Sequence, residues 1–136
     1  MADLTITAAN VAVEKEGATL ISVTFGEATT AGQSVYRNST DSKYYLTDAD
    51  LSRQAAEVRG IVHTGGAADA VGLIVTSGPM DVGATLTAGQ AYAASGTPGG
   101  IMPIDDWASG DWLSTLGVAE ASDSLIVRPR AEGVQI

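Results

Sequence analysis

One short stretch of sequence occurs twice: residues 26–33 read GEATTAGQ, and residues 83–90 read GATLTAGQ. Keeping the offset of 57 residues through residue 60 gives nine identical positions in a window of 35. Chance would give about three in a chain this rich in Ala, Gly and Thr. After a further shift of five residues, the LIV beginning at Leu73 matches the LIV beginning at Leu125. The chain is therefore predicted to contain two copies of one structural unit.

The matched residues are mostly of the kinds that end or turn a strand. Gly32 and Gly89 are predicted to adopt positive φ angles in a hairpin corner. Gly60 and Gly117 fall inside predicted strands, where a bulge or a sharp bend is expected. Repetition of turn residues, without unusual residues in one copy, favours a scaffold over an active site.

Short segments with alternating apolar residues surround the repeated stretch, each bounded by Gly, Asn, Asp, Ser or Pro. Strands are predicted at residues 34–37, 43–46, 58–63, 72–76, 90–94, 112–119 and 124–128. A short helix is expected at 48–57, with an irregular loop as the alternative, and the Gly-containing segments 64–72 and 99–104 are expected to be flexible turns. The predicted fold class is all-β: a small barrel or sandwich built from two pseudo-symmetric β-rich repeats, with at most one or two short helices.

The predicted organisation has two parts. Residues 1–25 form an extended N-terminal arm or first strands, and residues 26–136 form a β domain whose repeats span about 26–77 and 83–128. Leu4, Ile6 and Val11 give the N-terminal segment an alternating apolar pattern. Such an arm could add a strand to the sheet edge of a neighbouring protein. It could equally be an ordinary first strand of its own barrel.

Composition narrows the range of functions. The chain carries 7 Lys and Arg against 16 Asp and Glu, a net charge of -9, so binding to a nucleic-acid backbone is not expected. The absence of Cys excludes disulfides, thiolate zinc sites and a Cys nucleophile. No signal peptide is evident, and the longest aliphatic run, near residues 71–75, is too short to cross a bilayer. We therefore expect synthesis in a cytoplasm and no membrane partner.

The sequence offers little support for an enzyme. His63 is the only His and could act as a general base. It follows two aliphatic residues and precedes Thr-Gly-Gly, so a surface histidine at a strand end is the simpler interpretation. No phosphate-binding motif is present. No catalytic residue and no cofactor are therefore predicted.

Two groups of carboxylates could supply oxygen ligands to a Ca²⁺ ion. They are Asp41, Asp48 and Asp50, and Asp105, Asp106 and Asp111. Neither group has the spacing of an EF-hand loop, and carboxylates are common in turns and caps. No metal site is predicted.

Trp107 and Trp112 flank the short segment Ala-Ser-Gly-Asp. Exposed Trp pairs can form a platform for a sugar or a protein partner, whereas buried ones cover the end of a barrel. At least one Trp is expected to have the second role. Trp107 is retained as a candidate contact residue.

Three runs in the chain resemble the capsid decoration, or cement, proteins of tailed bacteriophages. They are MADLTITAANV at residues 1–11, GEATTAGQSVYRNSTDSKYYLTDAD at 26–50, and VGATLTAGQAYAASGTPGGIMPIDDWASGDWLSTLGVA at 82–119. The resemblance extends from residue 3 to about residue 134. Its elements are turn and strand patterns and include no catalytic signature.

The resemblance implies a virion protein on the outer surface of the capsid, commonly a homotrimer, that staples neighbouring major capsid subunits. Its implied partners are the major capsid protein and further copies of itself. Leu4, Ile6, Val11 and Trp107 are the candidate contact residues. Two alternatives remain open: a head-fibre or tail component, and a carbohydrate-binding adhesion module.

Overall fold

The computed structural model describes residues 3–13 and 16–135, and there it contains ten strands and three 3-10 turns but no α-helix. The all-β class predicted from the sequence is confirmed. The strands are β1 (Val11–Ala12), β2 (Thr19–Thr24), β3 (Ser34–Arg37), β4 (Tyr44–Leu46), β5 (Gly60–Thr64), β6 (Val71–Val82), β7 (Ala91–Ala94), β8 (Ile101–Pro103), β9 (Trp112–Ala121) and β10 (Ser124–Gln135). The 3-10 turns are η1 (Ala8–Asn10), η2 (Gln54–Ala56) and η3 (Ile104–Asp106).

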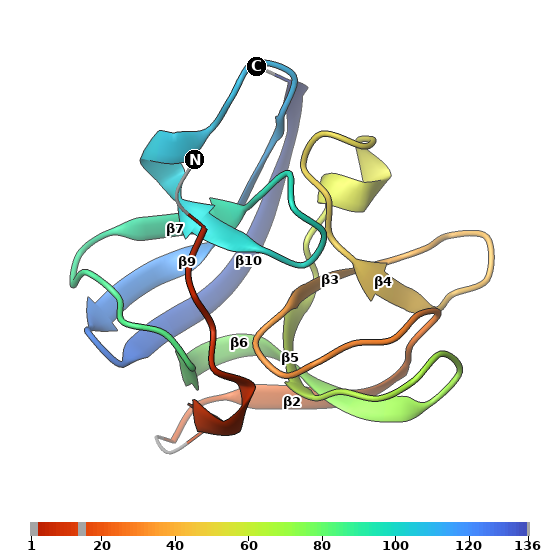
Figure 1. The fold of residues 1–136 in the computed structure, drawn as a ribbon, viewed down its shortest axis with the longest axis horizontal. Coiled ribbons are helices and arrows are strands. Elements are labelled where there is room, and N and C mark those ends of the chain that lie inside the picture. Colours follow the sequence, from red (N-terminus) through yellow and green to blue (C-terminus); the bar gives the residue numbers. More distant parts are fainter. Residues whose placement is uncertain (1–2, 14–15, 136) are drawn as a thin grey trace.

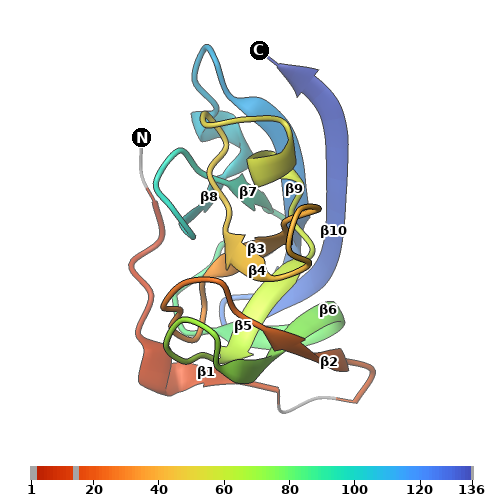
Figure 2. The ribbon, with the colours of Figure 1, turned by 90° about the vertical axis from the view of Figure 1, so that its right-hand side faces the viewer.

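The strands pair in one strongly curled antiparallel sheet. Its path is β4-β3-β5-β6-β10-β9-β7-β8, while β1 and β2 both pair with β6. Figure 1 shows the β3–β5 half on the right and the β7–β10 half on the left, with β6 passing below. Figure 2 shows that β10 is a long curved strand along one side of the molecule.

The strand pairing repeats with the same offset of 57 residues as the sequence. Val35 of β3 pairs with Gly60 of β5, and Tyr92 of β7 pairs with Gly117 of β9. The register between β3 and β4 recurs between β7 and β8 in the same way. The two sequence repeats therefore fold into equivalent sets of paired strands.

The TAGQ turns make equivalent hydrogen bonds. Gly32 and Gly89 have the predicted positive φ angles, 93° and 85°. Their N–H groups donate to the carbonyl oxygens of Val62 and Ala119, at 2.8 Å in both cases. The turns do not join two paired strands as a hairpin corner would. Each leads into β3 or β7 and ties the start of that strand to β5 or β9.

The last strands of the two repeats, β6 and β10, align with a different residue offset from the one that the sequence match indicates. Val62 pairs with Ile74, and Ala119 pairs with Leu125, which makes the offset 51 between β6 and β10. The shift is thus six residues, and the five-residue shift that matched the two LIV runs was wrong by one position. The register matters because a one-residue slip turns every side chain to the opposite face of the sheet.

Strand β6 belongs to both repeats. Residues 71–77 pair with β2, residues 78–80 pair with β10, and residues 81–82 pair with β1. Gly78, with φ of 96°, lies where β6 passes from one repeat to the other. The first repeat therefore runs from β2 into β6, and the second runs from β6 to β10.

Two hydrophobic clusters fill the fold. The smaller one lies inside the first repeat and contains Val23, Phe25, Val35, Val62 and Ile74. The larger one fills the second repeat and also includes residues of the first. Its members are Val58, Ile61, Val75, Met80, Val82, Leu86, Tyr92, Ile101, Leu116, Ala119, Leu125 and Val127. The second core thus extends across the boundary between the repeats.

Backbone hydrogen bonds also hold the repeats together. The N–H of Ser34 donates to Gly99 O (3.0 Å), and the N–H of Gly99 donates to Thr47 O (2.7 Å). On the same side of the first repeat, Trp112 N donates to Ala49 O at 2.7 Å. The relative position of the two repeats is therefore defined by backbone contacts as well as by the shared core.

Several predicted elements differ from the structure. The helix expected at residues 48–57 is only the 3-10 turn η2, because the N–H of Asp48 donates to Ala55 O (2.9 Å) and closes the segment as a loop. Residues 99–104 are not a flexible turn: they contain β8, whose Ile101 and Met102 are fully buried against β7. Strands β6 and β10 also continue past their predicted ends at residues 76 and 128.

We expect Gly78→Ala to lower the unfolding free energy by more than the cost of placing an alanine at a positive φ angle. A Cβ there would collide with the carbonyl oxygen of Gly17 and the backbone of Ala18, in addition to its unfavourable φ. Gly110 is a matched control, because its φ is 98° and a Cβ there meets nothing within 4 Å. Gly110→Ala should cost about 1–2 kcal/mol of unfolding free energy, and Gly78→Ala clearly more. Urea unfolding of both variants measures the difference. Equal losses of unfolding free energy in the two variants would contradict the close approach of Gly78 to the backbone of Gly17 and Ala18.

Candidate binding surface

An apolar row crosses the outer face of the second repeat. Ala91, Val118, Ile126 and Pro79 are successive cross-strand partners on β7, β9, β10 and β6. Directly paired residues of an antiparallel sheet lie on the same face, so these four side chains stand next to one another. Val118 is 47% exposed, and the other three are half-buried. We call these four residues the open row.

The first repeat has a row of side chains at the equivalent positions, but that row is buried. The equivalent cross-strand partners are Ser34, Ile61, Val75 and Leu20. Ser34, Ile61 and Val75 have no exposed surface, and Leu20 is half-buried. One sheet face thus occurs twice in this chain, buried in the first repeat and open to solvent in the second.

The first row is buried in a cluster that includes side chains of the second repeat. Ile61 and Val75 share the larger hydrophobic cluster with Leu116 of β9 and Val127 of β10. The N–H of Val58, just before β5, points at the hydroxyl oxygen of Ser114 on β9, at 3.4 Å. The second repeat therefore packs on the outer face of the first, while nothing within the described residues packs equivalently on its own outer face.

Two arginines border the open row. An open hollow of about 580 Å³ is lined by Ala91, Thr115, Gly117, Val118, Ile126, Arg128, Pro129 and Arg130. Among the residues that the structure describes, no ion pair or side-chain hydrogen bond engages Arg128, which is exposed. Arg130 is 2.8 Å from Glu132 through its Nε atom, but its side chain remains 74% exposed. The surface is locally cationic on a protein with a net charge of -9.

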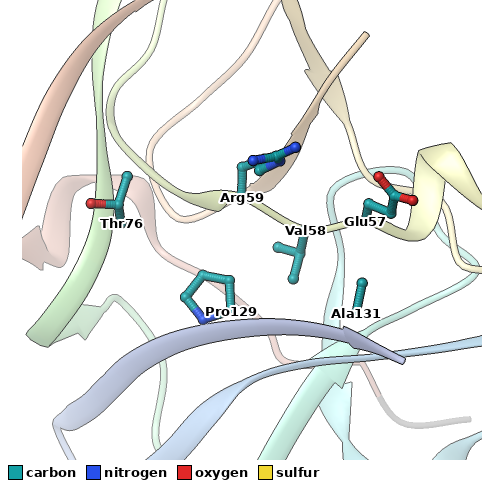
Figure 3. A pocket seen from close by; sticks show the side chains of 6 residues that line it. All are labelled: Glu57, Val58, Arg59, Thr76, Pro129 and Ala131. Atoms are coloured by element: carbon teal, nitrogen blue, oxygen red, sulfur yellow. The ribbon is translucent and has the colours of Figure 1, made fainter. Parts of the chain in front are cut away.

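A second hollow of about 460 Å³ lies around the far side of Pro129, between β10 and the segment that enters β5. In Figure 3, the Val58 side chain points toward the stretch of β10 that carries Pro129 and Ala131, and Arg59 points away from it. Arg59 is exposed and brings a third guanidinium to this side of the molecule. The two hollows share Pro129 and form one irregular surface along β10.

This surface was not predicted from the sequence. Two of the seven basic residues, Arg128 and Arg130, lie within three positions of each other. That local density was the available signal. The aliphatic character of Val118 and Ile126 carried none, because covered and open strand faces look the same in sequence.

The predicted contacts in the N-terminal segment lie against the chain's own second repeat. Leu4, Ile6 and Val11 are half-buried and pack on the larger hydrophobic cluster. The N–H of Leu4 donates to Ile101 O (2.7 Å), and the N–H of Thr7 donates to Gly83 O (2.8 Å). Of the two arrangements considered from the sequence, this one matches a segment that packs within its own domain rather than an arm that extends to a neighbouring protein.

The two tryptophans are both half-buried and do not form a bare exposed pair. The guanidinium carbon of Arg53 lies 5.0 Å from the centre of the Trp112 ring, a cation–π contact between the repeats. The Nε1 atom of Trp107 is buried and has no hydrogen-bond partner among the described residues. Trp107 thus lies at the edge of the second repeat with its polar atom directed inward.

The remaining candidates do not assemble into a catalytic or metal site within the described part of the chain. His63 is half-buried, and its Nδ1 is 2.9 Å from the hydroxyl of the adjacent Thr64. No group of three or more His, Cys, Asp or Glu side chains in residues 3–13 and 16–135 is placed to hold a metal ion. Over the same residues, no helix is both long and apolar enough to cross a membrane.

Asp48 lies among other acids near the boundary between the repeats. Partial burial, a side-chain hydrogen bond with Asp50 and the charges of Asp50 and Asp111 raise the pKa of Asp48 to about 6. Each of these causes disfavours the ionised carboxylate. Protonation of Asp48 therefore stabilises the fold fully below about pH 3.8, and this contribution is lost as the pH rises through about 6.

We expect Asp48→Asn to make the protein more stable than the wild type above pH 6, with the difference disappearing below pH 4. The neutral amide keeps an oxygen that can accept the hydrogen bond from the N–H of Asp50. Thermal unfolding from pH 4 to pH 8 measures the effect. Asp105→Asn, at the matching position of the second repeat, controls for the loss of one negative charge. A melting-temperature gain independent of pH would refute the proposed cause.

The comparisons with known proteins identify no relative. No protein-family model, no curated protein and no solved structure matches this chain.

Proposed function

We propose that this protein is a virion structural protein that binds the outer surface of a tailed-phage capsid and stabilises the shell. The observation that carries the proposal is the open row, in which Ala91, Val118, Ile126 and Pro79 present an apolar face to solvent. A contiguous apolar patch with a polar border is typical of a protein-binding surface. The resemblance to decoration proteins supplies the partner, the major capsid protein. The proposed role needs no catalytic step.

The proposed mechanism is mechanical. A rigid sheet with backbone contacts between its repeats can bridge two shell proteins without rearranging on binding. Several weak contacts become strong when they are linked within one oligomer, because later contacts form at high effective concentration. A homotrimer, closed by one interface used three times, would provide this linkage. The net charge of -9 favours solubility before assembly and a position away from packaged DNA.

A carbohydrate-binding adhesion module is the second candidate function, and the two tryptophans motivate it. Their environment supports it less well, because Arg53 already occupies one face of the Trp112 ring. Glycan-dependent quenching of tryptophan fluorescence would favour this candidate. A head-fibre or tail component is a related alternative, which mass spectrometry of separated heads and tails distinguishes from a capsid protein.

We expect the purified protein to bind decoration-free expanded heads of its parent phage and to raise their resistance to heat. The heads are incubated with protein, separated by sedimentation and analysed for bound subunits. Unexpanded heads are the control, because cementing would follow shell expansion. Absence of binding to expanded heads, with no gain in heat resistance, would refute the proposed function.

A further inference from the structure

We propose that the open row, together with Arg128 and Arg130, binds an extended protein segment that presents an aliphatic side chain and a carboxylate two residues apart. This inference rests on the proposed function only for the source of the segment, which would be a shell protein. The difference between the two repeats and the charges beside the row define the site itself.

The first repeat shows what kind of surface covers this row. Its Ile61 and Val75 are buried in the same cluster as Leu116 and Val127, two aliphatic side chains presented by neighbouring strands. The open row has the same backbone arrangement, with Val118 and Ile126 in the equivalent places. An occupant of the open row should therefore also present aliphatic side chains from extended backbone.

A second copy of the chain does not supply that surface. In every copy, Leu116 and Val127 are already buried in the larger hydrophobic cluster. Their equivalents in the first repeat, at offsets of 57 and 51, are Arg59 and Thr76, which are polar. If the first repeat of a second copy packed on the open row in the way that the two repeats pack within one chain, Arg59 and Thr76 would face the apolar row. Such stacking would place polar groups against apolar side chains.

The charges beside the row distinguish it from its covered counterpart. Arg128 stands where the first repeat has Ser77, at the offset of 51 residues, and Arg130 has no equivalent there because β6 has already passed into the second repeat at Gly78. Arg128 is exposed and Arg130 is largely exposed, so both guanidiniums can accept a new partner. Guanidiniums bind carboxylates with two parallel hydrogen bonds in favourable geometry. The occupant should therefore carry Asp or Glu as well as aliphatic residues.

The spacing follows from the strand. Arg128 is two residues beyond Ile126 on β10, which corresponds to about 7 Å along an extended chain. The pairing of β10 with β9 shifts register between Val127 and Arg130, but Ile126 and Arg128 line the same hollow. A segment lying along β10 would match this spacing with an aliphatic residue and an acidic residue at positions i and i+2, on the same face. This alternation defines the probe for the experiment.

The test is an NMR titration of the isotope-labelled full chain with the acetylated peptide Thr-Val-Thr-Asp-Thr-Val-Thr-Asp-Thr. The methyl signals of Val118 and Ile126 and the Nε–H signals of Arg128 and Arg130 should shift together, and added salt should weaken binding. The same peptide with Lys in place of Asp should bind at least fivefold more weakly. Equal binding of both peptides, or shifts confined to other parts of the molecule, would overturn the inference.

Variants locate the contact. Val118→Asp, and Arg128→Glu combined with Arg130→Glu, should each weaken peptide binding roughly tenfold, which corresponds to about 1.4 kcal/mol. Val71→Asp is the matched control, because Val71 is an exposed β-strand valine of the first repeat, 67% accessible, and should leave binding unchanged. Thermal unfolding confirms that each variant is folded. Loss of binding in Val71→Asp as large as in Val118→Asp would overturn the inference.

Failure of this inference can be separated from failure of the proposed function. If the wild-type protein and folded Val118→Asp bind expanded heads equally well, the capsid role stands and the open row is not the contact. If the peptide binds the open row but no head does, the site stands and the capsid role falls. Concentration-dependent shifts of Val118 and Ile126 without peptide would identify a second copy as the occupant and overturn the inference.

Discussion

Strand β6 pairs with strands of both repeats and thereby fixes how the two repeats are joined. Because β6 is the last strand of one repeat and the first of the next, the repeats cannot separate or rotate independently of each other. Gly78 allows the strand to pass between them at a φ that other residues adopt only with strain. The backbone of the preceding turn at Gly17 lies so close that no side chain fits at this position.

Sharing one strand gives the repeats unequal surroundings. The second repeat packs against the outer face of the first and buries Ile61 and Val75, whereas the equivalent Val118 stays exposed. If the two repeats packed symmetrically, their outer sheet faces would be either both buried or both exposed. Because the packing is not symmetric, the outer face of the second repeat, which carries the open row, is not covered by the other residues that the structure describes. That face is available to a partner. The asymmetry thus links the repeated sequence to a surface that the fold leaves open.

The sequence predicted those parts of the fold that depend on local chemistry. Positive φ at Gly32 and Gly89 followed from residue type, and β3 was predicted with its observed bounds, because alternation and flanking turn residues coincided. Strand β8 was missed because Gly and Pro surround it, and only its pairing with β7 makes it a strand. The open row could not be predicted, because Ile61 and Val118 are both aliphatic residues one position after a glycine. Which of them is covered depends on how the repeats pack, a tertiary property that neither local pattern contains.

The most direct test of this account is the solvent accessibility of four methyl-bearing residues in the free protein. Relaxation of the Ile61, Val75, Val118 and Ile126 methyl protons by a soluble paramagnetic agent measures it. We expect strong relaxation for Val118, a smaller effect for Ile126, and almost none for Ile61 and Val75. Similar relaxation at Ile61 and Val118 would contradict the unequal packing of the repeats and remove the basis for the binding surface.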